Sequence, residues 1–214
     1  SLVVSGGHTS LFYLETQGNY KEISRTRDDA AGEALDKLSK YLGLGYPGGP
    51  IIDRLAKLGD HHSVPFTIPK ISDGSLDFSF SGIKTAALRH LQKQHISPLN
   101  IDVGGSAEHI PKPVLNLLAS YQTSIIDQLL DRLERALEQW NVQAVHISGG
   151  VSHNSELRLR GTDFFKKRGL PIYFPSPELT TDNAAMIAAA GILSLRKGNS
   201  DSWNLTAEPN LKLG

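Results

Sequence analysis

The feature that most constrains the fold is a repeated motif, in which Ser-Gly-Gly follows directly after a short apolar segment. It occurs at residues 4–7 and again at residues 147–150. A glycine pair after a strand leaves backbone N–H groups unobstructed, and concave amide arrays of this kind bind phosphate or carboxylate oxygens. The same residues also suit an ordinary tight hairpin turn. Two such turns at strand ends predict a nucleotide cradle built from two lobes or from a pseudo-repeat.

The apolar periodicity predicts an α/β chain. Residues 2–5, 11–14 and 20–25 form three short strands of an antiparallel meander, and an amphipathic helix then runs to Leu42, with Asp28 and Asp29 as its cap and Gly43 as its end. We expect further helices at 51–59, 83–94, 114–139, 155–168 and 184–195, and strands at 144–147 and 172–174. This alternation favours an α/β layer architecture. We divide the chain into an α/β lobe, residues 1–196, and a surface tail, residues 197–214.

The composition excludes several classes of protein. With 39% hydrophobic and 21% charged residues, the chain is neither disordered nor collagen-like nor a coiled coil as a whole. Its 22 Lys and Arg balance 22 Asp and Glu, so nucleic acid or an anionic membrane would have to be bound by a local patch. The absence of cysteine excludes disulfides, thiolate zinc sites and iron–sulfur ligation.

The chain carries no segment that predicts membrane insertion or secretion. Its longest apolar run, residues 184–195, is far shorter than the roughly 20 residues of a membrane-spanning helix, and nothing resembles a signal peptide. We therefore expect a soluble intracellular protein. Because the sequence opens directly on the strand that begins at Leu2, we also expect that an amino-terminal portion is missing.

Several polar side chains near the starts of predicted helices are candidates for ligand or metal binding. Asp36 shares a helix face with Asp29 and Glu33 and could accept hydrogen bonds from ribose hydroxyls. Asp182 and Asn183 precede a predicted helix, where either residue suits an N-cap. Asp182 also suits a cation ligand. None of the eight histidines is paired in an HExxH or HxxxH pattern, so no complete metal site can be assembled.

A basic cluster follows one predicted helix and its end. It could contact RNA phosphates or form an ordinary solvated helix face. Its members are Arg158, Arg160, Lys166, Lys167 and Arg168.

Six ordered motifs resemble the tRNA N6-adenosine threonylcarbamoyltransferase family, and the resemblance covers nearly the whole chain. They are Val-Ser-Gly-Gly-His-Thr at 4–9, Asp-Asp-Ala-Ala-Gly-Glu-Ala-Leu-Asp-Lys at 28–37, Tyr-Pro-Gly-Gly-Pro at 46–50, Phe-Ser-Phe-Ser-Gly-Ile-Lys-Thr at 78–85, Gly-Gly-Val-Ser-His-Asn at 149–154 and Thr-Asp-Asn-Ala-Ala-Met at 181–186. The resemblance implies an actin/Hsp70/sugar-kinase-like fold, of which this chain is mostly the second lobe, with the first lobe largely missing. It also implies transfer of a threonylcarbamoyl group from threonylcarbamoyl-AMP to N6 of the adenosine beside the anticodon, in tRNAs that read ANN codons.

The resemblance also assigns substrate-binding residues. Asp36 and Gly49 would hold the ribose region, Asp53 would add a ribose contact, and Asn154 would contact the adenylate from the second lobe. The threonylcarbamoyl-phosphate part would be cradled by backbone amides of Val3, Val4, Ser5, Gly6 and Gly7.

A divalent metal is implied in the same way, with Asp182 as a ligand. Iron is the first expectation, and zinc or magnesium the alternatives; the cation would act as a Lewis acid. The family holds its metal with an HxxxH pair upstream of the first Ser-Gly-Gly turn, and that pair is absent here. We therefore predict that this 214-residue chain alone binds metal weakly and has little or no transfer activity.

The partners implied are tRNA, a non-catalytic paralogue that forms a heterodimer, and an ATPase accessory protein, with no membrane. The implied compartment is a bacterial cytoplasm, with an organelle as the alternative. A different class of function is a catalytically silent binding or dimerisation module of the same fold. A sugar kinase or chaperone-type ATPase would share the fold but not the motifs at 28–33 and 78–82. A metallopeptidase would need a zinc-binding pattern that the sequence lacks.

Overall fold

A five-stranded mixed sheet forms the centre of the computed structural model, which describes residues 1–69, 71–99 and 109–208. Its order is β3-β2-β1-β4-β5. The first three strands pair antiparallel, whereas β4 and β5 run parallel to β1 and to each other. The strand bounds are β1 Leu2–Val4, β2 Thr9–Thr16, β3 Asn19–Arg25, β4 Val145–Ser148 and β5 Ile172–Tyr173. The predicted antiparallel meander and both later strands are therefore confirmed.

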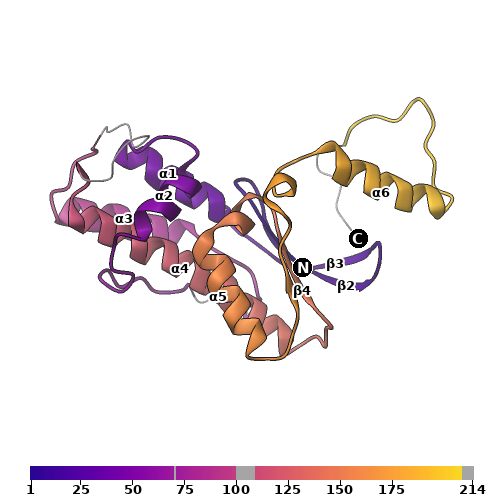
Figure 1. Ribbon diagram of the computed structural model, residues 1–214, viewed down its shortest axis with the longest axis horizontal. Coiled ribbons are helices and arrows are strands. Elements are labelled where there is room, and N and C mark those ends of the chain that lie inside the picture. Colours follow the sequence, from indigo (N-terminus) through magenta and orange to yellow (C-terminus); the bar gives the residue numbers. More distant parts are fainter. Residues whose placement is uncertain (70, 100–108, 209–214) are drawn as a thin grey trace.

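The described part of the chain contains six α-helices. Their bounds are α1 Ala31–Leu42, α2 Gly48–Ala56, α3 Ser81–Lys93, α4 Lys112–Leu137, α5 Ser155–Lys166 and α6 Ala184–Arg196. Helices α1 to α5 lie together on one side of the strands, and α6 lies apart on the other side (Figure 1). Two short 3₁₀ segments, η2 Gly150–His153 and η3 Pro177–Leu179, follow β4 and β5. All the helices expected from periodicity are present, with bounds that differ by a few residues.

Helix α4 is the scaffold of the helical layer. Its buried stripe, which includes Leu118, Ile125 and Leu129, packs into the main hydrophobic core. Burial of each such side chain stabilises the fold by about 1.5–3 kcal/mol. Tyr121 lies on the same stripe, fully buried, and its hydroxyl donates to the carbonyl of Ala34 at 3.0 Å. Because α1 carries Ala34, this hydrogen bond fixes α1 against α4.

The start of α1 differs from the sequence expectation. The helix is preceded by Ala30, whose backbone N–H donates to Glu33 at 3.1 Å, and the amide of Ala31 donates to Thr9 Oγ1 at 3.0 Å. The prediction that Asp28 and Asp29 cap α1 is wrong. The reason is tertiary: Asp28 accepts hydrogen bonds from the start of α3, and Asp29 pairs with Lys37 and Lys84.

Helix α6 makes little contact with the rest of the molecule. None of its residues is buried, and Ile187 and Leu195 are 70% and 66% exposed. Lys197, just beyond α6, donates to the carbonyl of Gln17 in the turn between β2 and β3. Of the expected tail, residues 209–214 lie outside the described residues. Within the ranges that the structure describes, no helix has the length and apolarity needed to cross a lipid bilayer.

Candidate functional site

The two Ser-Gly-Gly segments meet at one edge of the sheet. Strands β1 and β4 are parallel neighbours, with Val3 opposite Ser148, so the turns that follow them emerge side by side. Gly149 sits directly on β1: a Cβ added there would lie 2.4 Å from the carbonyl oxygen of Val4, and its φ of 90° is in the left-handed region. Ligands of open α/β sheets bind at the carboxyl ends of such strands. This edge is therefore the candidate site.

The first turn is closed by its own hydrogen bonds. Ser5 Oγ accepts the amides of Gly7 at 3.3 Å and His8 at 3.0 Å, and the amide of Ser5 donates to the carbonyl of His8 at 2.8 Å. Gly6 and Gly7 are exposed. Within the described chain, the Gly6 amide is the one N–H of this turn without a partner, so the turn offers an open surface rather than a fully free amide array.

The backbone of the first turn rests on α1. The Ser5 carbonyl accepts the amide of Gly32 at 3.1 Å, and a Cβ at Gly32 would lie 2.6 Å from that oxygen. Val3 and Val4 belong to β1, where they pair with Ser10 and Thr9 of β2. Their backbone groups are therefore directed mainly toward neighbouring strands. Within residues 3–7, Gly6 and Gly7 present the open face.

Asp36 joins α1 to the start of α2. Its Oδ1 accepts the amides of Gly48 at 2.7 Å and Gly49 at 3.3 Å, which caps α2 from a neighbouring helix. A Cβ added at Gly6 would lie 4.0 Å from Oδ2 of Asp36. No described residue donates to Oδ2, so this oxygen faces the first turn with its lone pairs free.

Asp53, one turn further along α2, holds the start of α5. Its Oδ2 accepts the amide of Ser155 at 3.1 Å, and its Oδ1 accepts the Ser155 hydroxyl at 2.8 Å. Oδ1 also accepts from Gln122 Nε2 at 3.3 Å. The carboxylate thereby links α2, α4 and α5, and one lone pair of Oδ2 stays unused by described residues.

Asn154 is the N-cap of α5. Its Oδ1 accepts the amide of Leu157 at 3.0 Å, and its Nδ2 donates to Gln122 Oε1 at 2.8 Å. An amide nitrogen carries two hydrogens, so one N–H of Asn154 remains for a ligand. The structure therefore brings Gly6, Asp36, Gly49, Asp53 and Asn154 into one connected arrangement.

Sequence reasoning missed Gln122. It lies on α4 beside Tyr121, only 2% exposed, and hydrogen-bonds both Asp53 and Asn154. The available signal was a polar residue inside an apolar helical stripe, which identifies a buried hydrogen-bonding group but not its partners.

Asp182 lies apart from this arrangement. It is exposed, and no hydrogen bond or ion pair joins it to another described residue. Asn183, not Asp182, caps α6: its Oδ1 accepts the amide of Met186 at 3.0 Å. Across residues 1–69, 71–99 and 109–208, no group of three His, Asp or Glu side chains is placed to hold a metal ion.

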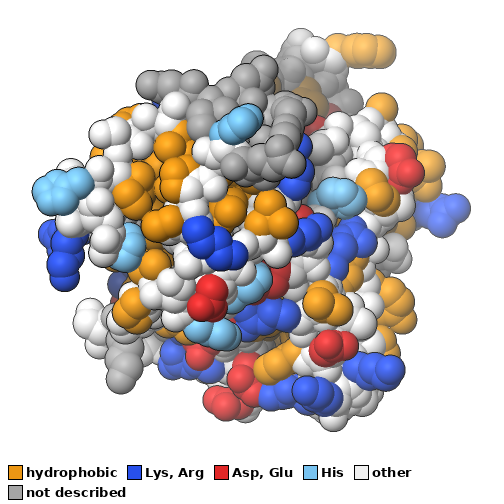
Figure 2. Space-filling view, turned by 60° about the vertical axis from the view of Figure 1, so that its left-hand side comes forward, with side chains coloured by type: hydrophobic (Ala, Val, Ile, Leu, Met, Phe, Trp, Pro, Cys, Tyr) orange, Lys and Arg blue, Asp and Glu red, His pale blue; other side chains and the backbone are white. Residues whose placement is uncertain are grey.

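The basic cluster on α5 is mostly paired internally. Arg158 donates to the carbonyls of Ser152 and Pro175, Arg160 binds Asp127 and Glu156, and Arg168 binds Glu134. Burial lowers the pKa of Arg160, but hydrogen bonds to the two carboxylates raise it on balance. Lys166 and Lys167 are exposed. On the face shown in Figure 2, basic and acidic side chains are interspersed rather than gathered by sign.

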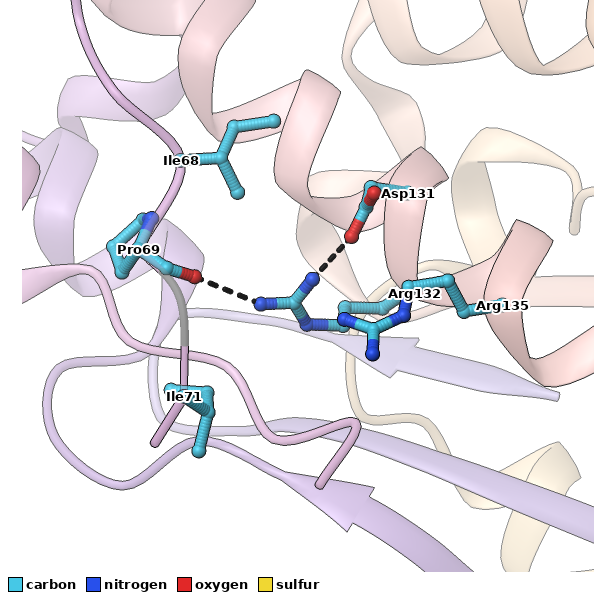
Figure 3. Close-up of a pocket in the computed structure, with 6 residues that line it drawn as sticks. All are labelled: Ile68, Pro69, Ile71, Asp131, Arg132 and Arg135. Carbon is cyan, nitrogen blue, oxygen red and sulfur yellow. Dashed lines mark hydrogen bonds and ion pairs between the residues drawn. The ribbon is translucent and has the colours of Figure 1, made fainter. Parts of the chain in front are cut away.

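Among the described residues, two cavities lie outside the candidate site. One of about 350 Å³ lies beside α4, where buried Arg132 donates to the carbonyl of Pro69 and pairs with Asp131 (Figure 3). The other, of about 620 Å³, is bounded by the loop after α2 and by α4 and α5. It includes Glu156, which also accepts a hydrogen bond from Gln122. Neither cavity is lined by Asp36 or Asn154.

Comparisons with known proteins agree on one family. Residues 1–189 match the family model described as "TsaD: tRNA N6-adenosine threonylcarbamoyltransferase". Proteins of that name are 44% identical over 213 residues in Clostridium perfringens strain SM101 and 47% identical over 213 residues in Thermodesulfovibrio yellowstonii. These matches cover 100% and 99% of this chain, but 60% and 61% of the relatives. The chain therefore spans about 60% of the length of these curated relatives.

A solved structure shows the same fold at low sequence identity. It is the "Activator of the 2-Hydroxyisocaproyl-CoA Dehydratase from Clostridium difficile with bound ADPNP", with a TM-score of 0.50 and 15% identity. The match covers 96% of this chain and 64% of that one. The expected α/β fold of the actin, Hsp70 and sugar-kinase type is confirmed.

Proposed function

Because the chain belongs to the tRNA N6-adenosine threonylcarbamoyltransferase family, we propose that the sheet edge formed by β1 and β4 binds threonylcarbamoyl-AMP. In the proposed activity, the threonylcarbamoyl group is then transferred to N6 of the tRNA adenosine beside the anticodon. The solved activator structure, which has the same fold, is named with bound ADPNP, an adenine nucleotide, and this supports an adenylate as the class of ligand.

One observation carries the proposal: the site side chains are anchored, yet each keeps hydrogen-bonding capacity. Asp36 uses Oδ1 to cap α2 and leaves Oδ2 free. Asp53 leaves a lone pair on Oδ2, and Asn154 leaves one N–H. The two acceptors, on Asp36 within α1 and Asp53 within α2, and the donor on Asn154 at the start of α5 suit the two ribose hydroxyls and an acceptor atom of an adenylate. Pre-anchored groups lose little conformational entropy when the ligand binds.

The proposed transfer is an acyl substitution. N6 of the adenosine attacks the carbamoyl carbonyl carbon and forms a C–N bond, while the bond from that carbon to the phosphate oxygen breaks. AMP leaves with the electron pair, and the N6 proton is released. In this chain Gly6 and Gly7 provide an open backbone surface for the acyl-phosphate part, with the Gly6 amide as the available donor.

The described residues do not fit a metal centre by themselves. Asp182 is an exposed single carboxylate, and no group of three ligating side chains occurs among the residues that the structure describes. Iron, zinc or magnesium bound through Asp182 would require ligands from elsewhere. No step of the proposed transfer is therefore routed through a metal.

The proposed partners are tRNA as acceptor, a non-catalytic paralogue and an ATPase accessory protein, and the proposed compartment is the bacterial cytoplasm. Lys166 and Lys167 support the tRNA contact, since they are exposed and carry no ion pair among the described residues. Folded RNA would gain affinity from such unpaired cations.

A silent binding module is the second candidate function. The absence of a three-ligand metal group within the described residues favours it. The two candidates differ in one measurement: a silent module binds the adenylate but does not modify tRNA, even when the remaining part of the family sequence is supplied in trans.

The test is calorimetric titration of the chain with a non-hydrolysable threonylcarbamoyl-AMP analogue. Asp36→Asn keeps an oxygen for the amides of Gly48 and Gly49 but replaces the free acceptor with a donor. Asn154→Ser keeps an N-cap oxygen but removes the amide donor. We expect each to weaken binding about tenfold or more, whereas Asp163→Asn, on the exposed face of α5, leaves it unchanged. A folded wild-type chain that does not bind the analogue would contradict the proposal.

A further inference from the structure

Gln122 is a polar side chain enclosed within the helical layer. It lies on α4 with 2% exposure. Its Nε2 donates to Asp53 Oδ1 at 3.3 Å and to Glu156 Oε2 at 3.1 Å, and its Oε1 accepts from Asn154 Nδ2 at 2.8 Å. These hydrogen bonds of the amide therefore all join it to side chains on α2 and at the start of α5.

The partners determine which way the amide faces. The two carboxylates can only accept hydrogen bonds, so the NH₂ group must point toward Asp53 and Glu156. The carbonyl oxygen then points toward Asn154, whose own oxygen is already occupied by the amide of Leu157. With the amide reversed, oxygen would face carboxylate and NH₂ would face NH₂, which loses every one of these bonds. The orientation of Gln122 is thus fixed from three sides.

This orientation in turn fixes the orientation of Asn154. A reversed Asn154 amide would lose both the N-cap bond to Leu157 and the bond to Gln122. The N–H that Asn154 keeps for a ligand therefore points in one direction only. Gln122 also supplies one of the two donors to Oδ1 of Asp53. A single side chain on α4 thus connects two of the proposed adenylate contacts, Asn154 and Asp53.

We propose that Gln122 is a positioning residue for the adenylate, acting through Asn154 and Asp53. This inference rests on the proposed function. Gln122 itself is too buried to contact a ligand. Its role is to hold the unused N–H of Asn154 and the unused lone pair of Asp53 in the directions that the adenylate requires, so that binding does not have to order them.

Glu156, the other carboxylate that Gln122 hydrogen-bonds, belongs to a group of side chains that lines a surface cavity. Glu156 also accepts from Thr123 Oγ1 at 2.9 Å and from Arg160 at 3.0 Å, and His61 lies 3.5 Å from it. These groups line the cavity of about 620 Å³ together with Asp127. Thr123 is therefore a matched control position: it is the next residue on α4 and hydrogen-bonds Glu156, but it hydrogen-bonds neither Asp53 nor Asn154.

The experiment compares adenylate-analogue affinity for the wild-type chain and for Gln122→Met, Gln122→Glu and Thr123→Val. Gln122→Met keeps the length of the side chain but makes no such hydrogen bonds, and we expect about a tenfold or greater loss of affinity. Thr123→Val removes the neighbouring hydrogen bonds to Glu156 and His61, and we expect less than about a twofold change in affinity. A comparable loss in both variants would reduce Gln122 to a general packing role and overturn the inference.

Gln122→Glu tests the positioning role through the pH dependence of analogue affinity, which a purely structural role of Gln122 would not change. Ionised, the new carboxylate cannot donate and is repelled by Asp53 and Glu156. Protonated, it has one donor and one carbonyl acceptor, which restores part of the amide pattern. Burial and the two neighbouring carboxylates favour the protonated form of the introduced carboxyl group. We therefore expect the affinity of Gln122→Glu to recover as the pH is lowered from about 8 to about 6.

The wild-type chain, measured over the same pH range, is the reference, because His61, Arg160 and Asp127 also surround Glu156. A Gln122→Glu profile parallel to the wild-type profile would overturn the positioning role while leaving the proposed function intact. If the folded wild-type chain does not bind the analogue at any pH, the proposed function fails, and the inference fails with it.

Discussion

Asp28 caps helix α3 from 52 residues away in the sequence: its Oδ1 accepts the amide of Phe80 at 2.7 Å. The same carboxylate accepts the Ser81 amide at 3.2 Å and the hydroxyls of Ser79 and Ser81. Four donors from one turn thus converge on one side chain. Because α1 begins shortly after Asp28, at Ala31, this contact joins the starts of α1 and α3.

Removal of this cap should destabilise the chain. We expect Asp28→Ala to lower the free energy of unfolding by about 1 kcal/mol, the usual cost of a lost helix cap. Asp28→Asn retains an acceptor oxygen for the amides and should cost less. Urea denaturation measures both, and equal stability of Asp28→Ala and wild type would contradict the capping role.

The same contact should contribute to acid sensitivity. Burial raises the pKa of Asp28, but the hydrogen bonds from Ser79, Phe80 and Ser81 outweigh it and lower the pKa on balance. A carboxyl whose folded pKa is depressed stabilises the fold above its unfolded pKa of about 3.9, and this stability is lost as the pH falls through the lower folded value. We therefore expect the stability of Asp28→Asn to change less than that of wild type between about pH 5 and about pH 2, measured by denaturation at each pH.

The second glycine turn offers a matched pair of substitutions. Gly149→Ala places a methyl group 2.4 Å from the Val4 carbonyl at a φ of 90°, and we expect a loss of about 2 kcal/mol or more. Gly150→Ala meets no atom within 4 Å and should change stability by less than about 0.5 kcal/mol. Thermal unfolding of both variants tests this; equal effects would mean that β1 and the turn after β4 do not approach each other this closely.

Replacement of isoleucine by lysine should affect stability very differently at an exposed and at a buried position. Ile187 on α6 is 70% exposed, whereas Ile125 on α4 is 1% exposed. We expect Ile187→Lys to leave the free energy of unfolding within about 0.5 kcal/mol of wild type. Ile125→Lys buries an unpaired ammonium group and should prevent stable folding. Circular dichroism during denaturation distinguishes them, and a large loss from Ile187→Lys would show that α6 is packed in solution.

Because Arg158 and Arg160 are already bound to other groups of the protein, Lys166 and Lys167 are the residues of the basic cluster that we propose to contact tRNA. We expect the double variant Lys166→Glu, Lys167→Glu to bind tRNA more weakly at low salt. Its affinity should also depend less steeply on salt, with the slope smaller by roughly one unit for each phosphate that is no longer neutralised. Lys21→Glu with Lys93→Glu makes the same charge change elsewhere and serves as the control. Filter binding at several salt concentrations measures both, and identical behaviour of the two double variants would remove Lys166 and Lys167 from the interface.

The sequence by itself determined the elements and much of the candidate site. The helix that ends at Leu42, the long helix through Ile125 and the strand meander follow from apolar periodicity, because each helix or strand must bury one face. The motifs located Asp36, Gly49 and Asn154, and the family resemblance added Asp53; the structure connects these four.

Only the tertiary structure decided which groups bind one another. Sequence spacing assigned Asp28 to the nearest helix, but in the folded chain its carboxylate binds the start of α3. Arg158 and Arg160 form a basic run in sequence but are held by carbonyls and carboxylates in space. The local pattern around Gln122 indicates burial but not its partners, because these lie on two other helices. Periodicity reports how much of a residue is buried, whereas hydrogen bonds between distant segments depend on how the helices pack, which no local pattern encodes.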